Sequence, residues 1–193
     1  MSQVEIFYNK IWHIIDTTNK TFCTESSGLR THYTEFASNV KKFFSIFDGA
    51  RNQLTIILAE KTCLNYSAIL GTVLSGNTWI PLSLENPVDR NLEIIRHIKP
   101  HMVLTDRILS SEIQNFLDQS KIKTRRIDKI SAQSETPKVD FDGRFEENAI
   151  PMIYFTSGST GKPKGVKISN LGLTTAVSKI VPLLGVSEEI WGD

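Results

Sequence analysis

Residues 153–168 read IYFTSGSTGKPKGVKI and hold the most informative pattern in the chain. A strand-like apolar segment and a second segment with β-branched residues enclose a loop of three glycines, four hydroxyl side chains and two lysines. Glycine permits positive φ angles and close backbone approach, so successive N–H groups can converge on phosphate oxygens while the hydroxyls add donors. Pro163 stiffens the turn between the lysines and so holds Lys164 in place. The pattern predicts a polyphosphate-binding loop between two strands.

Three well-known loops differ from this pattern. A Walker A loop needs four residues between its glycines, whereas two residues separate Gly158 from Gly161, and Lys162 precedes proline. A nucleophile elbow needs glycine where Ser157 stands, so Ser159 is a poor nucleophile candidate. The glycine spacing of a dinucleotide-binding turn does not occur in the loop. The alternative that remains is a flexible Gly/Ser hairpin that binds nothing.

Upstream of the loop, short apolar segments alternate with segments of helical character. Residues 54–59 are β-branched and almost wholly apolar, as in a parallel strand buried on both faces. The segments that follow are a predicted helix at 65–75, a strand at 79–82, a helix at 88–98, a strand at 102–104 and a helix at 109–119. This alternation predicts an α/β fold, a layered parallel sheet with helices on both faces. In such sheets ligands bind beyond the carboxyl ends of the strands.

The segments before the first strand are predicted to be helical. Apolar residues recur at spacings of three and four from residue 33 to residue 47, which predicts a helix that ends at Asp48 and Gly49. Residues 1–28 are interpreted as an N-terminal packing helix and lead-in. Residues 29–193 form the second unit, with a loop at 131–148 where serine, proline, glycine and charged residues are dense.

Composition narrows the range of partners. The 22 basic and 21 acidic side chains nearly cancel, so no net charge attracts nucleic acid or an anionic membrane. The start of the chain lacks the basic and apolar regions of a signal peptide, and the longest strongly apolar run, 54–59, is too short to cross a bilayer. We therefore expect a cytoplasmic protein that binds neither nucleic acid nor membrane. Cys23 and Cys63 stand far apart and are expected to be buried, reduced thiols.

Other polar residues carry weaker signals. Residues 121–126, KIKTRR, could contact RNA or an acidic carrier protein, but such runs are most often solvated faces and we prefer that interpretation. The four histidines, which show no metal-ligand clustering, are His13, His32, His97 and His101. No residue of the chain is predicted to be catalytic or to bind a metal.

The loop resembles the signature motif of the adenylate-forming superfamily, which includes acyl-CoA synthetases, luciferases and the amino-acid adenylation domains of peptide synthetases. Residues 156–165, TSGSTGKPKG, match T-S-G-[ST]-T-G-x-P-K-G at every fixed position. Residues 33–36 and 70–82 resemble two further motifs of the family in the same order. Ser83 stands where the family usually has aspartate, and Asn170 where histidine is common.

The resemblance implies the first subdomain of the adenylate-forming fold and the activation of a carboxylate with ATP and Mg²⁺. In that reaction the carboxylate attacks the α-phosphorus of ATP, pyrophosphate leaves, and the acyl adenylate passes to a thiol. Residues 87–105 resemble the amino-acid-activating branch more than the acyl-CoA branch, so an amino acid substrate is expected. The residues expected to bind the β- and γ-phosphates are Thr156, Ser157, Gly158, Ser159, Thr160, Gly161 and Lys164. Lys162 is expected to be solvated.

The resemblance also implies that parts of the family's active site are missing from this chain. The acyl pocket, the acidic ligand of Mg²⁺ and the C-terminal domain of the family would lie beyond residue 193, so we expect an N-terminal fragment without adenylation activity of its own. Its partners would be a carrier protein or the missing C-terminal half. The alternative is a non-catalytic nucleotide-binding or partner-docking module, which an exposed apolar face on the final helix, at 171–184, would favour.

Overall fold

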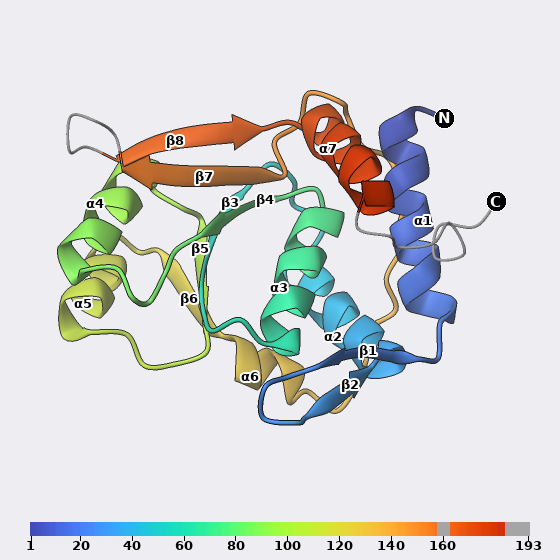
Figure 1. The fold of residues 1–193 in the computed structure, drawn as a ribbon. Coiled ribbons are helices and arrows are strands. Elements are labelled where there is room, and N and C mark those ends of the chain that lie inside the picture. The colour runs from blue at the N-terminus through green and yellow to red at the C-terminus, as the bar shows by residue number, and fades with distance from the viewer. Residues whose placement is uncertain (158–162, 184–193) are drawn as a thin grey trace.

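A computed structural model describes residues 1–157 and 163–183, and places a six-stranded sheet between two layers of helices (Figure 1). The strands are β3 (Leu54–Leu58), β4 (Thr78–Pro81), β5 (Met102–Thr105), β6 (Lys123–Arg126), β7 (Met152–Ser157) and β8 (Pro163–Ile168). Their order is β6-β5-β3-β4-β7-β8, and every neighbouring pair is parallel except β7 and β8. The predicted α/β fold is confirmed, with one antiparallel strand at its edge.

Helices cover both faces of the sheet, as the two-sided apolar strands predict. The helices of the main body are α2 (Tyr33–Ser45), α3 (Cys63–Leu74), α4 (Val88–Ile98), α5 (Ser111–Gln119) and α6 (Ile127–Ser131). Ile56 and Leu58 of β3 pack with α4 and α5, whereas Ile57 packs on the opposite face with α2, α3 and α6. Successive side chains of a strand point to opposite faces, so β3 contributes to both cores. None of the helices in the described residues is long and apolar enough to cross a membrane.

The sheet ends in a strand that the sequence did not predict. β6 reads KTRR, and its side chains alternate between exposed and half-buried. Lysine and arginine are common on edge strands because their charge hinders pairing with another chain. The basic run at 121–126 is therefore in large part an edge strand, and its Lys123 and Arg125 side chains are exposed.

A small hairpin before α2 corrects the prediction for the cysteines. β1 (Thr21–Thr24) pairs with β2 (Arg30–His32), and this hairpin lies against the start of α3. Cys23 and Cys63 form a disulfide, with Cα atoms 6.6 Å apart, where reduced thiols were expected. The expectation was wrong because it rested on sequence spacing, whereas the hairpin brings the two residues together. The Glu25 carboxylate also accepts a hydrogen bond of 2.9 Å from the Cys63 N–H.

The first helix is held by residues that follow it by more than a hundred positions. α1 (Gln3–Thr17) lies beside α7 (Asn170–Leu183) in Figure 1 and packs against it. The Trp12 and Phe141 rings stack with centroids 4.5 Å apart, and Tyr8 stacks on Phe145 at 4.0 Å. The segment between α6 and β7 thus lacks regular structure and still has two aromatic anchors on α1.

A buried hydrogen bond joins α1 to the end of the sheet. The Tyr8 hydroxyl donates to Asn170 Oδ1 at 2.7 Å, and Asn170 Nδ2 donates to the Glu146 carbonyl at 2.8 Å. Burial raises the pKa of the Tyr8 phenol, so the hydroxyl keeps its proton and remains the donor. Asn170, where the family commonly has histidine, is thus bonded through both atoms of its side-chain amide.

We expect Tyr8→Phe to lower the free energy of unfolding by about 1–2 kcal/mol, because Asn170 Oδ1 would stay buried without its donor. Urea denaturation followed by circular dichroism measures the change. Tyr66→Phe is the matched control, since Tyr66 is 46 % exposed, and it should shift stability by less than about 0.5 kcal/mol. Equal effects from the two variants would contradict the role given to the buried bond.

Candidate nucleotide-binding site

The predicted phosphate loop connects β7 and β8 at the carboxyl end of β7. These strands form an antiparallel hairpin in which Thr156 lies opposite Lys164 and Ser157 opposite Pro163. Since β7 is parallel to β4, its carboxyl end lies at the edge of the sheet where the loops after β3, β4 and β5 also begin. This is the edge at which ligands bind in α/β folds. The predicted loop between two strands is confirmed in its position.

The hairpin has one buried face and one open face. Ile153 and Phe155 point into the core with α4 and α5. Tyr154 and Val166 lie opposite each other on the other face and are 48 % and 46 % exposed. A Cβ atom added at Gly165 would lie 3.0 Å from the Phe155 ring, so glycine at this position lets the ring pack under β8.

Thr156 and Lys164 come together on the open face. Alternation along the strands puts both on the side of Tyr154 and Val166, and both are exposed. Thr156 Oγ1 donates a hydrogen bond to the Lys164 carbonyl at 3.5 Å. A threonine and a lysine therefore face each other at the start and the end of the loop. For Ser157 the structure describes the backbone. The other residues predicted to bind phosphate, Gly158, Ser159, Thr160 and Gly161, lie outside the described residues, as does Lys162.

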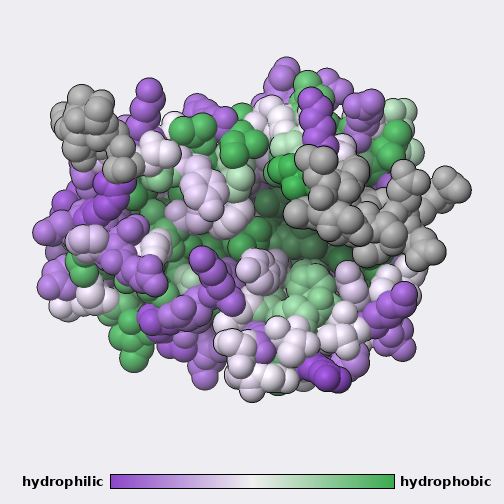
Figure 2. Space-filling view, in the orientation of Figure 1, coloured by the Kyte–Doolittle hydropathy of each residue, from purple (hydrophilic) through white to green (hydrophobic). Residues whose placement is uncertain are grey.

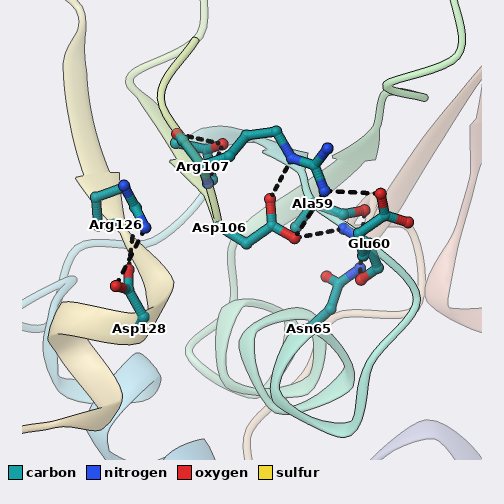
Figure 3. Close-up of polar contacts among 8 residues, drawn as sticks. Ala59, Glu60, Asn65, Asp106, Arg107, Arg126 and Asp128 are labelled. Carbon is teal, nitrogen blue, oxygen red and sulfur yellow. Dashed lines mark hydrogen bonds and ion pairs between the residues drawn. The ribbon is translucent and has the colours of Figure 1, made fainter. Parts of the chain in front are cut away.

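A charged network that the sequence analysis missed lies at the same edge of the sheet, after β3 and β5 (Figure 3). Arg107 Nη2 is 2.7 Å from Glu60 Oε1, and its Nε is 2.9 Å from Asp106 Oδ1. The Glu60 N–H donates to Asp106 Oδ2 at 2.9 Å. The network ties together the loops that leave two neighbouring strands. Each of its residues directly follows a strand or nearly so, which is the signal that could have identified it.

The network fixes the charge of its members. Burial by itself would raise the pKa of Asp106, but hydrogen bonds from Arg107 and from the Glu60 N–H, with the charge of Arg107, hold it below its usual value. Hydrogen bonds to Asp106 and Glu60 raise the pKa of Arg107. Asp106 and Arg107 are therefore both charged at neutral pH. Among the described residues no group of three or more histidine, cysteine, aspartate or glutamate side chains could hold a metal ion.

The loop after β4 is organised by Ser83, where the family usually has aspartate. The Ser83 hydroxyl accepts a hydrogen bond from the Glu85 N–H at 3.1 Å, and its carbonyl accepts one from Asn91 Nδ2 at 3.0 Å. Serine thus makes the short turn that leads into α4.

Comparison with known proteins identifies the family. The family profile described as AMP-binding enzyme matches residues 13–191. The chain belongs to the AMP-binding enzyme family. The match covers almost the whole chain, and it confirms the resemblance to adenylate-forming enzymes that the loop motif indicated.

The relatives of this chain include much longer proteins. The chain is 28 % identical over 145 residues to nonribosomal peptide synthetase sidE of Aspergillus fumigatus, which is 75 % of this chain and 7 % of that protein. It is 32 % identical over 120 residues to the D-alanine–D-alanyl carrier protein ligase of Lactococcus lactis, which is 62 % of this chain and 24 % of that protein. The chain thus spans a quarter or less of these two relatives.

Solved structures of other proteins share the fold. ATP-bound MatB from Rhodopseudomonas palustris matches with a TM-score of 0.79 and 17 % identity, over 93 % of this chain and 37 % of that one. The AMPPNP-bound nonribosomal peptide synthetase FmoA3 matches with a TM-score of 0.73 and 20 % identity, over 96 % of this chain and 19 % of that one. At these identities the likeness establishes the fold.

Proposed function

We propose that this chain is the ATP-binding part of a ligase that activates a carboxylate as its acyl adenylate and releases pyrophosphate. The observation that carries the proposal is the hairpin β7–β8, which brings Thr156 and Lys164 together at the two ends of the sequence TSGSTGKPKG. Membership of the AMP-binding enzyme family and the likeness to ATP-bound MatB support it.

In the proposed reaction the protein acts mainly on the leaving pyrophosphate. Negative charge builds on the β- and γ-phosphates as the α-phosphorus is attacked, so fixed N–H and hydroxyl donors with a cation stabilise the transition state. The ammonium group of Lys164 supplies the charge, and the hydroxyl of the opposite residue, Thr156, supplies a donor. The backbone and hydroxyl groups of residues 157–161 complete the proposed phosphate site.

Mg²⁺ is proposed to accompany ATP without a ligand from the phosphate loop. Mg²⁺ in nucleotide sites is held by carboxylates and by the phosphates themselves. Residues 156–168 contain no aspartate or glutamate, so the donor set of the loop fits phosphate oxygens and does not fit a metal ion. In this proposal the ion is bound through ATP and through residues outside the loop.

The acyl substrate is proposed to be an amino acid, with a carrier-protein thiol as acceptor. The peptide synthetase sidE and the D-alanine–D-alanyl carrier protein ligase, both similar to this chain, support this class of substrate and partner. We also propose that residues 29–193 form an N-terminal subdomain whose acyl pocket is supplied by further protein. The 193-residue chain would then bind ATP without forming an acyl adenylate.

A non-catalytic docking module is a second candidate, favoured by the apolar surface around the hairpin. Figure 2 shows hydrophobic residues over β7, β8 and α7 and around a hollow in this face of the molecule. Val166, Leu171 and Ile180 are 46 %, 40 % and 51 % exposed. Amino-acid-dependent exchange of pyrophosphate into ATP separates the candidates: the docking module predicts no exchange even when the C-terminal part of a related ligase is added, whereas the ligase part predicts that exchange then appears.

Calorimetric titration with ATP and Mg²⁺ tests the nucleotide site itself. We expect Lys164→Ala to weaken ATP binding about 10- to 100-fold, since a contact to a charged phosphate is lost. Lys167→Ala is the matched control, because Lys167 is an exposed lysine of the same strand on its other face, and it should leave the affinity within about twofold. Equal binding by wild type and Lys164→Ala would overturn the proposed site.

A further inference from the structure

A cavity of about 300 Å³ opens at the amino edge of the sheet, opposite the edge that holds the phosphate loop. Asn52, Asn77 and Pro151 line it, and they directly precede or closely precede β3, β4 and β7. Asn170 lines it too, because the antiparallel strand β8 ends at this edge. The volume is that of a small-molecule site.

The cavity is separate from the nucleotide site. β7 has six residues, and at about 3.3 Å per residue it sets the two sites roughly 20 Å apart. A molecule in the cavity cannot touch the phosphates of ATP in the phosphate loop. It would contact Pro151, just before β7, and Asn170, just after β8, at the end of the hairpin far from the loop.

The outer wall of the cavity is built from α1 and the segment at 144–146, and it is held in place. A Cβ atom at Gly143 would lie 2.5 Å from Asn9 Oδ1, so glycine with φ of +64° lets this segment lie directly on α1. Arg51 crosses the cavity edge and pairs with Asp142 at 2.8 Å. With the two aromatic stacks on α1, these contacts fix the wall without any helix or strand of its own.

The Arg51 side chain is fixed in one position by its neighbours. Its Nη1 donates to the Arg144 carbonyl at 2.9 Å, and its guanidinium lies 5.9 Å from the centre of the Phe145 ring. Gly76, with φ of +77°, leaves room for it, since a Cβ atom there would lie 3.1 Å from Arg51 Cγ. The Arg51 guanidinium is therefore held at the cavity by residues 142–145.

Charged side chains of both signs line the cavity, and two of them lack an ion-pair partner among the described residues. The cations are Arg51 and Arg144, and the anions are Glu5 and Glu146. Arg144 and Glu146 are exposed, and neither side chain takes part in an ion pair among the described residues. By contrast, the side-chain amide of the buried Asn77 is fully used, as it accepts from the Gln53 N–H and donates to the Ala50 carbonyl. The exposed side chains left to recognise a ligand are therefore Arg144, Glu146 and the neutral Asn52.

We propose that this cavity binds a small zwitterion of the amino acid class, with its carboxylate at Arg144 and its ammonium group at Glu146. Arg51 already pairs with Asp142, and Glu5 already accepts the Ser2 N–H, so Arg144 and Glu146 are the charges left for a ligand. A ligand with one charge would leave one of these two side chains unmatched, whereas a zwitterion satisfies both. Guanidinium groups bind carboxylates through two parallel hydrogen bonds, which favours the carboxylate as the anionic end. This site is independent of the carboxylate that the ligase activates.

The test uses the ¹⁵N-labelled 193-residue chain and defined probes. Glycine, β-alanine and 4-aminobutyrate supply zwitterions of increasing charge separation, and acetate and methylammonium supply the single charges. We expect at least one zwitterion to shift the side-chain amide signals of Asn77 and Asn170 saturably in NMR spectra, with at least tenfold higher affinity than either single charge. Shifts that do not saturate, or that acetate or methylammonium reproduces at equal affinity, would overturn the proposal.

Variants assign the effect to the cavity. Arg144→Gln and Glu146→Gln should each weaken the zwitterion at least tenfold, whereas Arg125→Gln, an exposed arginine on β6, should not. Lys164→Ala should leave it unchanged, so this result is independent of the outcome for ATP. Loss of the saturable shifts in Lys164→Ala, or their persistence at full affinity in both cavity variants, would contradict a site at the amino edge of the sheet.

Discussion

Gly71→Ala should lower the free energy of unfolding by about 3 kcal/mol and the melting temperature by roughly 6–12 °C. Gly71 lies in α3 where this helix crosses α2. A Cβ atom there would stand 2.6 Å from Phe43 Cβ, 2.8 Å from the Val40 carbonyl oxygen and 3.0 Å from the Phe44 nitrogen. Two of these atoms belong to the backbone of α2, so the clash can be relieved only if the helices separate.

Gly172→Ala is the matched control because Gly172 also lies in a helix, α7, where an added Cβ meets only Ser169 Oγ at 3.3 Å and Ile168 Cγ2 at 4.0 Å. This variant should be neutral or more stable by up to about 1 kcal/mol, since alanine favours helix. Thermal unfolding by calorimetry measures both. A Gly71→Ala protein as stable as Gly172→Ala would show that α2 and α3 do not pack at this distance.

Reduction of the Cys23–Cys63 disulfide should lower the free energy of unfolding by about 4 kcal/mol, which corresponds to roughly 8–16 °C in melting temperature. The bond joins residues 40 positions apart, and a loop of that length loses much conformational freedom in the unfolded chain. It also fixes the hairpin β1–β2 on the start of α3. Melting curves with and without a phosphine reductant measure the difference.

Cys23→Ser provides the control for the disulfide. Its melting temperature should equal that of the reduced wild type, and the reductant should not change it further. Titration of free thiols in the unreduced, unfolded wild type should find none. Two free thiols, or a wild-type melting curve that is insensitive to reductant, would contradict the covalent link.

Much of the sheet could be predicted because its inner strands are apolar on both faces. The strand at 54–59 and the helix at 88–98 agree with β3 and α4, the latter at both ends. α3 begins at Cys63, two residues before the predicted start, because the Thr62 hydroxyl accepts from the Asn65 N–H and caps the helix. A capping threonine in a polar loop carries little hydrophobic signal, so periodicity placed this end too late.

The elements that escaped prediction lack an apolar pattern of their own. β6 is an edge strand made of Lys123-Thr124-Arg125-Arg126, so its charges indicated a solvated run. The hairpin β1–β2 is short and mostly exposed or half-buried. Both are fixed by neighbours distant in sequence, which a local pattern cannot show.

The candidate site was predicted from the motif, and its surroundings were not. The motif predicted a loop between two strands, and the hairpin adds that Thr156 and Lys164 share one open face. ATP binding by these residues stays a prediction. The network of Glu60, Asp106 and Arg107 depends on the adjacency of β3 and β5. The sequence places these residues just after two strands, but the folded sheet is needed to show that the two strands are neighbours.

The bond between Tyr8 and Asn170 has a consequence for biosynthesis. These residues are 162 positions apart, and at about 5–20 residues per second a ribosome needs roughly 8–30 s to add the second after the first. During that interval the apolar side of the nascent helix α1 lacks the partners at 141–145 and 170. Helix α1 is thus made long before the residues that lock it into place, and chaperones that shield apolar helices have that time to act on it.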